Sequence, residues 1–211
     1  IVLCRDVSEL RRQERELITK DATIREIHHR VKNNLQTVAS LLRIQARRAN
    51  STETKESLEQ AMRRVSAIAL VHDTLSEGLN QEVSFDEVFD RVLLLVSEVA
   101  ASHNTTVRTI IDGRFGQLKS EKATPLAVAL TEIVTNAIEH GLNERSGNVL
   151  VHAERKQKKL IITVSDNGKG IPGGKIEPGL GTQIIRTLIE GELRGSISWF
   201  SPREGGARVV I

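Results

Sequence analysis

Three polar side chains at four-residue intervals form the first group that could do chemistry: Glu132, Asn136 and His140. In an α-helix this spacing places all three on one face. A carboxylate, an amide and an imidazole side by side suit a hydrated Mg²⁺ ion that bridges phosphates, because Mg²⁺ prefers oxygen ligands and keeps several waters. A polar stripe on a helix is more often ordinary solvated surface, so the signal is weak by itself.

A second group is the run from Asp166 to Gly170, which reads Asp-Asn-Gly-Lys-Gly and follows an apolar stretch. A strand that ends in Asp and then Gly-x-Gly holds one carboxylate at a sharp turn, where it can accept a hydrogen bond from an exocyclic amine. The two glycines allow a flat ring to approach the backbone. An ordinary turn explains Asp-Asn-Gly equally well.

A third group is Gly179-Leu180-Gly181-Thr182, a glycine pair at the start of a predicted helix. The first N–H groups of a helix have no partner within it and bind phosphates readily. The run does not fit the dinucleotide-binding fingerprint, because no strand directly precedes it.

Two adjacent histidines, His28 and His29, lie in a long charged helix near the N-terminus. At about 100° per residue, with Ile24 set to zero, the apolar stripe falls within about 60°. His28 then lies near about 40°, beside the stripe, and His29 near about 140°, facing solvent. Of the two, His29 is therefore the one that an external group could reach, and the alternative is that both are ordinary surface residues. His72 falls on the apolar stripe of the next helix and is interpreted as a packed core histidine.

The elements that must position these groups begin with a helical hairpin. The pattern predicts helices over residues 8–50 and 54–75, with Ser51 or Thr52 capping the second. One pair of helices cannot bury two such apolar stripes completely, so we predict a homodimer that forms a four-helix bundle. The stripe residues are Ile24, Ile27, Val31, Leu35, Val38 and Leu42 on the first helix, and Leu58, Met62, Val65, Ala69, His72 and Leu75 on the second.

The rest of the chain has a different texture, with several short strands grouped together and separate helices. This arrangement predicts an α+β sandwich in which helices cover one face of a mixed sheet. Helices are predicted at 85–102, 122–141 and 182–190, and strands at 1–7, 107–111, 149–154, 160–165, 196–201 and 207–211.

Composition excludes several classes of protein. The 211 residues are 39% hydrophobic and 27% charged, as in soluble globular domains, and only 2% are aromatic, so stacking of nucleic-acid bases is not expected. The net charge is only +3, and the 27 acidic residues are interspersed with the 30 basic ones, which also argues against direct nucleic-acid binding. Cys4 is the single cysteine, which fits a reducing cytoplasm, and no apolar stretch is long enough for a membrane span. The chain begins with Ile1, and we expect it to be part of a longer protein.

The three groups at residues 132–140, 166–170 and 179–182, taken together and in this order, resemble the N, G1 and G2 boxes of the GHKL ATP-binding fold. The resemblance covers about residues 82–211. The resemblance implies ATP and Mg²⁺ as cofactors, with Asp166 binding the adenine amine, Asn136 holding Mg²⁺ and Glu132 acting in catalysis. It also implies a lid at residues 172–178. The other nucleotide-binding residues that it implies are Gly168 and Gly170 at the adenine, and Gly179, Leu180, Gly181 and Thr182 at the phosphates. Glu139 stands where many kinases have a cation, so His140 or Lys169 is the candidate group to neutralise the phosphates.

Residues 26–36, Glu-Ile-His-His-Arg-Val-Lys-Asn-Asn-Leu-Gln, resemble the phosphoacceptor box of the second HisKA-type histidine kinase family, close to the HWE kinases. Residues 64–73 resemble the second helix of that family. The resemblance implies a sensor kinase that phosphorylates its own His29 and then passes the phosphoryl group to the receiver domain of a response regulator. In kinases of this kind, the regulator carries an RNA-binding antitermination output. Arg30 stands where many kinases have an acidic residue, so Glu26, one turn before His29, is the provisional proton acceptor.

Residues 5–10 resemble the last strand of a PAS sensor running into a signalling helix, and an ordinary strand–helix junction is the alternative. We therefore expect three parts: residues 1–22 as the end of a sensor domain, 23–79 as the dimerisation and phosphoacceptor hairpin, and 80–211 as the ATP-binding domain. One rival function is a GHKL ATPase or protein-serine kinase, against which the hairpin argues. Another is a phosphotransfer or scaffold protein without ATP, against which Asn136 and Asp166 argue.

Overall fold

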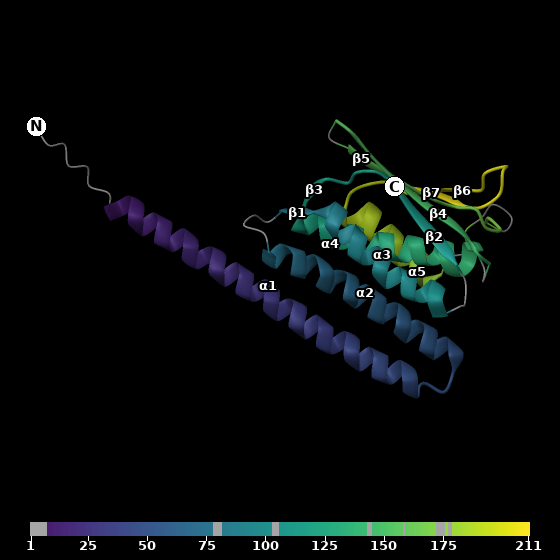
Figure 1. The fold of residues 1–211 in the computed structure, drawn as a ribbon, viewed down its shortest axis with the longest axis horizontal. Helices are drawn as coiled ribbons and strands as arrows, with labels where there is room; N and C mark the ends of the chain where they lie inside the picture. The colour runs from purple at the N-terminus through teal and green to yellow at the C-terminus, as the bar shows by residue number, and fades with distance from the viewer. Residues whose placement is uncertain are drawn as a thin grey trace, which may run out of the picture.

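The computed structural model describes residues 8–77, 82–102, 106–142, 145–157, 159–171, 176 and 179–211. A long helical hairpin lies along the helical side of an α/β layer (Figure 1). The strand predicted at residues 1–7, and most of the lid predicted at 172–178, lie outside the described residues.

The hairpin consists of α1 (Ser8–Arg48) and α2 (Thr52–Glu77), and neither helix contains Gly or Pro to interrupt it. Ser51 caps α2, as predicted, because its Oγ accepts a hydrogen bond of 3.0 Å from the N–H of Thr54. α1 is continuous through the boundary predicted at residue 22. None of the helices described is both long enough and apolar enough to cross a membrane.

The C-terminal layer is built on a five-stranded sheet with the order β2-β4-β5-β7-β6. β2 and β4 pair in parallel and the other neighbours are antiparallel, so the sheet is mixed, as predicted. A second sheet, β1 with β3, was not predicted, because each strand has only three residues. The strands are β1 (Glu82–Ser84), β2 (Val107–Gly113), β3 (Gln117–Lys119), β4 (Gly147–Lys156), β5 (Lys159–Asp166), β6 (Ser198–Phe200) and β7 (Arg208–Val210).

Three helical segments cover one face of this sheet (Figure 1). Along β4, Val149, Val151 and Ala153 are buried and Leu150 between them is 39% exposed, the alternation of a sheet with one covered face. Two of the α-helices continue directly into π-helices. The segments are α3 (Phe85–Ser102), α4 (Ser120–Asn136) followed by the π-helix Ala137–Leu142, and α5 (Leu180–Arg186) followed by the π-helix Thr187–Glu192.

Helix α2 is shared between the hairpin and the α/β layer. It packs against α1 on one side and against α3 and α4 on the other (Figure 1). Val71 and Leu75 of α2 belong to the same core as Phe85 and Phe89 of α3. The sequence pattern predicted only the face of α2 that meets α1.

Candidate nucleotide-binding and phosphoacceptor site

The helix with the first polar group does not keep α-helical geometry to its end. α4 ends at Asn136, and Ala137–Leu142 form a π-helix, whose turns are closed by bonds between residues i and i+5. Glu132 is 4% exposed, whereas His140 faces solvent. Glu132 and Asn136 therefore lie on the α-helix, whereas His140 lies in the π-helical turn that follows it, with its side chain exposed.

The glycine pair lies directly on this helix. A β-carbon added at Gly181 would lie 3.2 Å from Oε2 of Glu132 and 3.9 Å from Nδ2 of Asn136. Gly179 precedes α5 with an extended backbone and no side chain caps the helix, so its first N–H groups are not used by a cap. The structure thus brings the first and third groups together.

Asp166 ends β5, where the sequence placed it, and only 9% of its surface is exposed. Its Oδ1 accepts hydrogen bonds from the N–H groups of Gly168, at 2.9 Å, and Ala207, at 3.3 Å. Burial raises the pKa of the Asp166 carboxyl, and these hydrogen bonds act in the opposite direction. Among the described residues Oδ2 accepts no hydrogen bond, so one oriented oxygen remains for an amine.

The second group meets the end of the first through backbone contact. A β-carbon at Gly141 would lie 2.8 Å from Cγ of Asp166, and one at Gly168 would lie 2.0 Å from the carbonyl oxygen of Gly141. Gly170 has a φ of +74°, a region that favours glycine. Sequence reasoning did not single out Gly141, although it directly follows the predicted His140.

The two histidines of α1 lie as the helical angles predicted. His29 is exposed, and Nδ1 of His28 lies 2.9 Å from Nδ1 of His72 on α2. Burial, and then the charge on His29, lower the pKa of His28; burial, and then His28, lower the pKa of His72. Both rings are therefore favoured in the neutral form, in which one Nδ1 donates and the other accepts.

Glu26, the provisional proton acceptor, is engaged with Arg30 on the same exposed helix face. The Nε of Arg30 donates to its Oε1 at 2.7 Å. This hydrogen bond, followed by the charge of Arg30, lowers the pKa of the Glu26 carboxyl. The structure therefore directs Glu26 toward Arg30.

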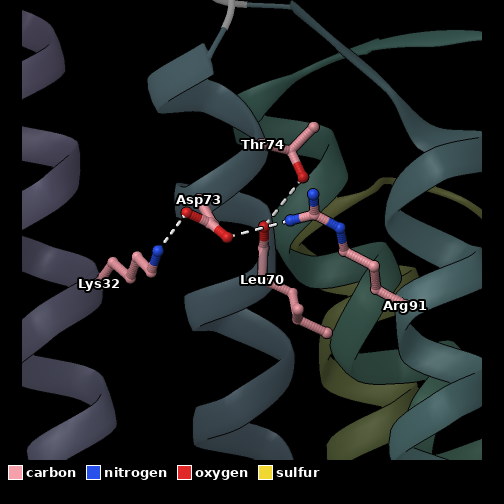
Figure 2. A network of polar contacts seen from close by, with 5 residues as sticks. All are labelled: Lys32, Leu70, Asp73, Thr74 and Arg91. Atoms are coloured by element: carbon pink, nitrogen blue, oxygen red, sulfur yellow. Dashed lines mark hydrogen bonds and ion pairs between the residues drawn. The ribbon is translucent and has the colours of Figure 1, made fainter.

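A charged network centred on Asp73, the residue after His72, was not predicted (Figure 2). Asp73 of α2 pairs through Oδ1 with Nζ of Lys32 on α1, at 2.5 Å, and through Oδ2 with Nη1 of Arg91 on α3, at 3.0 Å. The hydroxyl of Thr74 donates to the carbonyl oxygen of Leu70, at 3.1 Å, as an intrahelical bond. One carboxylate therefore joins three helices, and a lone Asp on the apolar side of α2 was the only sequence signal.

Two arginines of α2 reach the helix that carries Asn136. Arg64 binds Glu132 through two parallel hydrogen bonds, Nε to Oε1 at 2.9 Å and Nη2 to Oε2 at 2.8 Å. Its neighbour Arg63 donates from Nη2 to Oε1 of Glu139 at 3.2 Å. The sequence analysis did not identify either arginine as a site residue. The sequence feature that could have identified them is their position beside the apolar residues of a long helix.

Together, the fold and the site define an ATPase-type α/β domain, of the kind in histidine kinases, behind a helical hairpin with an exposed histidine. Residues 26–100 match the histidine kinase family HisKA_2, and residues 121–211 match the histidine kinase-, DNA gyrase B- and HSP90-like ATPase family. The chain belongs to the histidine kinases of the HisKA_2 family. It is 49% identical over 215 residues to the sensor histidine kinase PdtaS of Mycobacterium tuberculosis, an alignment that covers all of this chain and 43% of PdtaS.

Two solved structures show the same fold. The histidine kinase domain of the blue-light-activated kinase EL346 of Erythrobacter litoralis superposes with a TM-score of 0.60 and 25% identity, over 92% of both chains. The histidine kinase ThkA, solved in complex with the response regulator protein TrrA, shares the fold with a TM-score of 0.50 and 21% identity, over 98% of this chain and 66% of that one.

Proposed function

We propose that this chain is the catalytic core of a two-component sensor histidine kinase, which transfers the γ-phosphoryl group of ATP to His29 and then to an aspartate of a response regulator. One observation carries the proposal: residues distant in sequence around Asn136, Asp166 and Gly181 contact one another, in a chain that also exposes His29 on a helix. Family membership supports the same activity.

The residues present fit a nucleotide with Mg²⁺. Oδ2 of Asp166 would accept the adenine amine beside Gly168 and Gly170, and the turn from Gly179 to Thr182 would bind the phosphates through its N–H groups. Asn136 offers the oxygen ligand that Mg²⁺ prefers, and the ion would supply charge neutralisation at the phosphates. His140 or Lys169 is the proposed group that neutralises the phosphates.

His29 acts as the nucleophile in this proposal through a neutral ring nitrogen, with positioning as the main contribution of the protein. Its helix α1 packs on α2, and α2 packs on α4, which carries Asn136 (Figure 1). α2 therefore stands between the two helices. Phosphoryl transfer then requires either a second arrangement of the ATP-binding layer or nucleotide bound to a second copy.

A homodimer is part of the proposal. Among the described side chains of α1, five large apolar ones are exposed in the single chain, at 38% to 56% of their surface: Ile24, Ile27, Val38, Leu41 and Ile44. Three of them belong to the predicted stripe, and a second hairpin that packs there would complete a four-helix bundle. Light scattering on the purified chain tests this state.

The proposed partner is a receiver domain, which would dock near the exposed His29. The complex of ThkA with TrrA is a precedent in another kinase. The same proposal includes a regulator with an RNA-binding antitermination output and a cytoplasmic location. It also includes the division of the chain into residues 1–22, 23–79 and 80–211. The chain spans 43% of the length of the curated relative PdtaS, so the activity of a whole sensor protein is also proposed rather than observed.

Autophosphorylation with γ-labelled ATP and Mg²⁺ tests the proposal. We expect the parent and His28→Gln to take up label, and His29→Gln and Asn136→Ala to take up none. The label should survive base and be lost in acid, as a phosphoramidate is. ATP hydrolysis without retained label would instead favour the ATPase alternative.

A further inference from the structure

We propose that Arg64, a residue of the hairpin, is a positioning residue of the nucleotide site, because it fixes and neutralises Glu132 beside the phosphate-binding turn. The inference deepens the proposed function and rests on it. In this proposal, α2 contributes a residue that orients a side chain of the nucleotide site.

The first reason is the geometry of the pair. Both oxygens of Glu132 accept hydrogen bonds from Arg64, and the exposed fractions of the two side chains are only 6% for Glu132 and 16% for Arg64. A planar guanidinium that binds a carboxylate through two parallel bonds fixes its orientation as well as its charge. Lysine in the same place would supply charge without that orientation.

The second reason is the position of the pair. Oε2 of Glu132, which accepts the 2.8 Å hydrogen bond from Arg64, also lies 3.2 Å from the β-carbon position of Gly181. Gly181 belongs to the turn proposed to bind the phosphates. The carboxylate of Glu132 therefore lies between the guanidinium of Arg64 and that turn.

The third reason is charge. A buried carboxylate without a partner is costly by itself, and it would also repel the anionic phosphates of a nucleotide at the adjacent turn. The neighbouring π-helix adds a second acid, Glu139, and Arg63 pairs with it at 3.2 Å. Each of these two acids is thus matched by a cation from α2, which leaves the phosphate end of the pocket without uncompensated negative charge from them.

A purely structural role is the rival explanation. In that case Arg64 would only fasten the hairpin to the α/β layer, and its loss would lower stability without changing nucleotide affinity in the folded protein. Affinity, measured at a temperature where each variant is folded by circular dichroism, separates the two explanations.

The test is equilibrium binding of a fluorescent ADP, with Mg²⁺, to the full chain and to Arg64→Gln, Arg64→Lys and the double variant Arg64→Gln/Glu132→Gln. Lys55→Gln is the matched control, because it removes a positive charge from α2 at an exposed pair with Glu59. We expect Arg64→Gln to weaken binding at least tenfold, Arg64→Lys to weaken it less, and Lys55→Gln to leave it unchanged. The double variant should bind more tightly than Arg64→Gln, because the uncompensated carboxylate is gone.

Each other outcome has a definite meaning. If Arg64→Gln is folded and binds within twofold of the parent, the inference is wrong and the proposed function stands. If the double variant binds as weakly as Arg64→Gln, charge is not the cause and the inference is again wrong. If the parent itself binds no nucleotide, the proposed function fails and the inference fails with it.

Discussion

Substituting Asp73 by Asn removes the negative charge that joins three helices (Figure 2). The amide keeps the shape of the side chain and loses both ion pairs, with Lys32 of α1 and with Arg91 of α3. Two cations from different helices would then face a neutral group. We expect the contacts of α2 with α1 and with the ATP-binding layer to weaken together.

The size of the effect follows from the partial burial of the network. The side chains of Asp73, Lys32 and Arg91 are 22%, 25% and 37% exposed. Exposed pairs contribute about 0.2–1 kcal/mol, and breaking a buried pair costs about 3–5 kcal/mol. Values near the upper end of the exposed range give about 1 kcal/mol for each pair and about 2 kcal/mol in total. For a chain of this size that corresponds to a melting temperature lower by about 4–8 °C.

Thermal and urea unfolding of parent and variant measure this difference. Glu59→Gln is the control, because it removes a carboxylate of the same helix from an exposed pair 4.0 Å long, and we expect less than about 0.5 kcal/mol. Added NaCl should reduce the Asp73→Asn effect, because salt screens partly exposed charges. An Asp73→Asn protein with a free energy of unfolding within about 0.5 kcal/mol of the parent would refute the reasoning.

Three further predictions concern other contacts. Burial lowers the pKa of His28 and His72 in the folded chain, so the unfolded chain binds protons more readily. The contribution of the two histidines to stability is therefore full above the unfolded pKa of about 6.5 and is lost as pH falls through the folded values. His72→Gln should make this loss of stability smaller in thermal melts recorded from about pH 7.5 to 5. Gly141→Ala places a β-carbon 2.8 Å from Cγ of Asp166 and should weaken nucleotide binding at least tenfold in a fluorescence titration, whereas Gly191→Ala, with nothing within 4 Å, should bind like the parent. Ser51→Ala removes the cap of α2 and should cost about 1 kcal/mol in urea unfolding, and a loss below a few tenths would show that the cap is redundant.

Local patterns predicted the elements that local physics determines. The turn of the hairpin follows from the polar break and the cap at Ser51. The strands of the β4–β5 pair follow from two short, largely apolar runs joined by a charged turn. The place of Asp166 at the end of β5 was predicted because a buried strand followed by Asp-Asn-Gly must turn there. Helical angles also separated His28, which contacts His72, from the exposed His29, but half of the predicted stripe on α1 (Ile24, Ile27 and Val38) is exposed in the single chain.

Features that depend on tertiary contact were not predicted. The π-helix after Asn136, which contains His140, leaves no mark in a periodicity read at 100° per residue. Arg64 and Glu132 are 68 residues apart, and no local pattern pairs a cation of one helix with an acid of a distant one. The stripe on α2 showed that it meets α1, but its second, mixed face gave no sign that α4 would cover it.

The position of α2 links the two halves of the proposed site. Between residues 64 and 73 it contacts α1 through His72 and Asp73, and α4 through Arg64. These contacts span about 13 Å along one uninterrupted helix, which moves as a unit because its backbone bonds are intact. A rotation of α2 that changes its contact with His28 must also displace the guanidinium that holds Glu132. The orientation of the phosphoacceptor helix and the charge beside the phosphate-binding turn are therefore set by the same element.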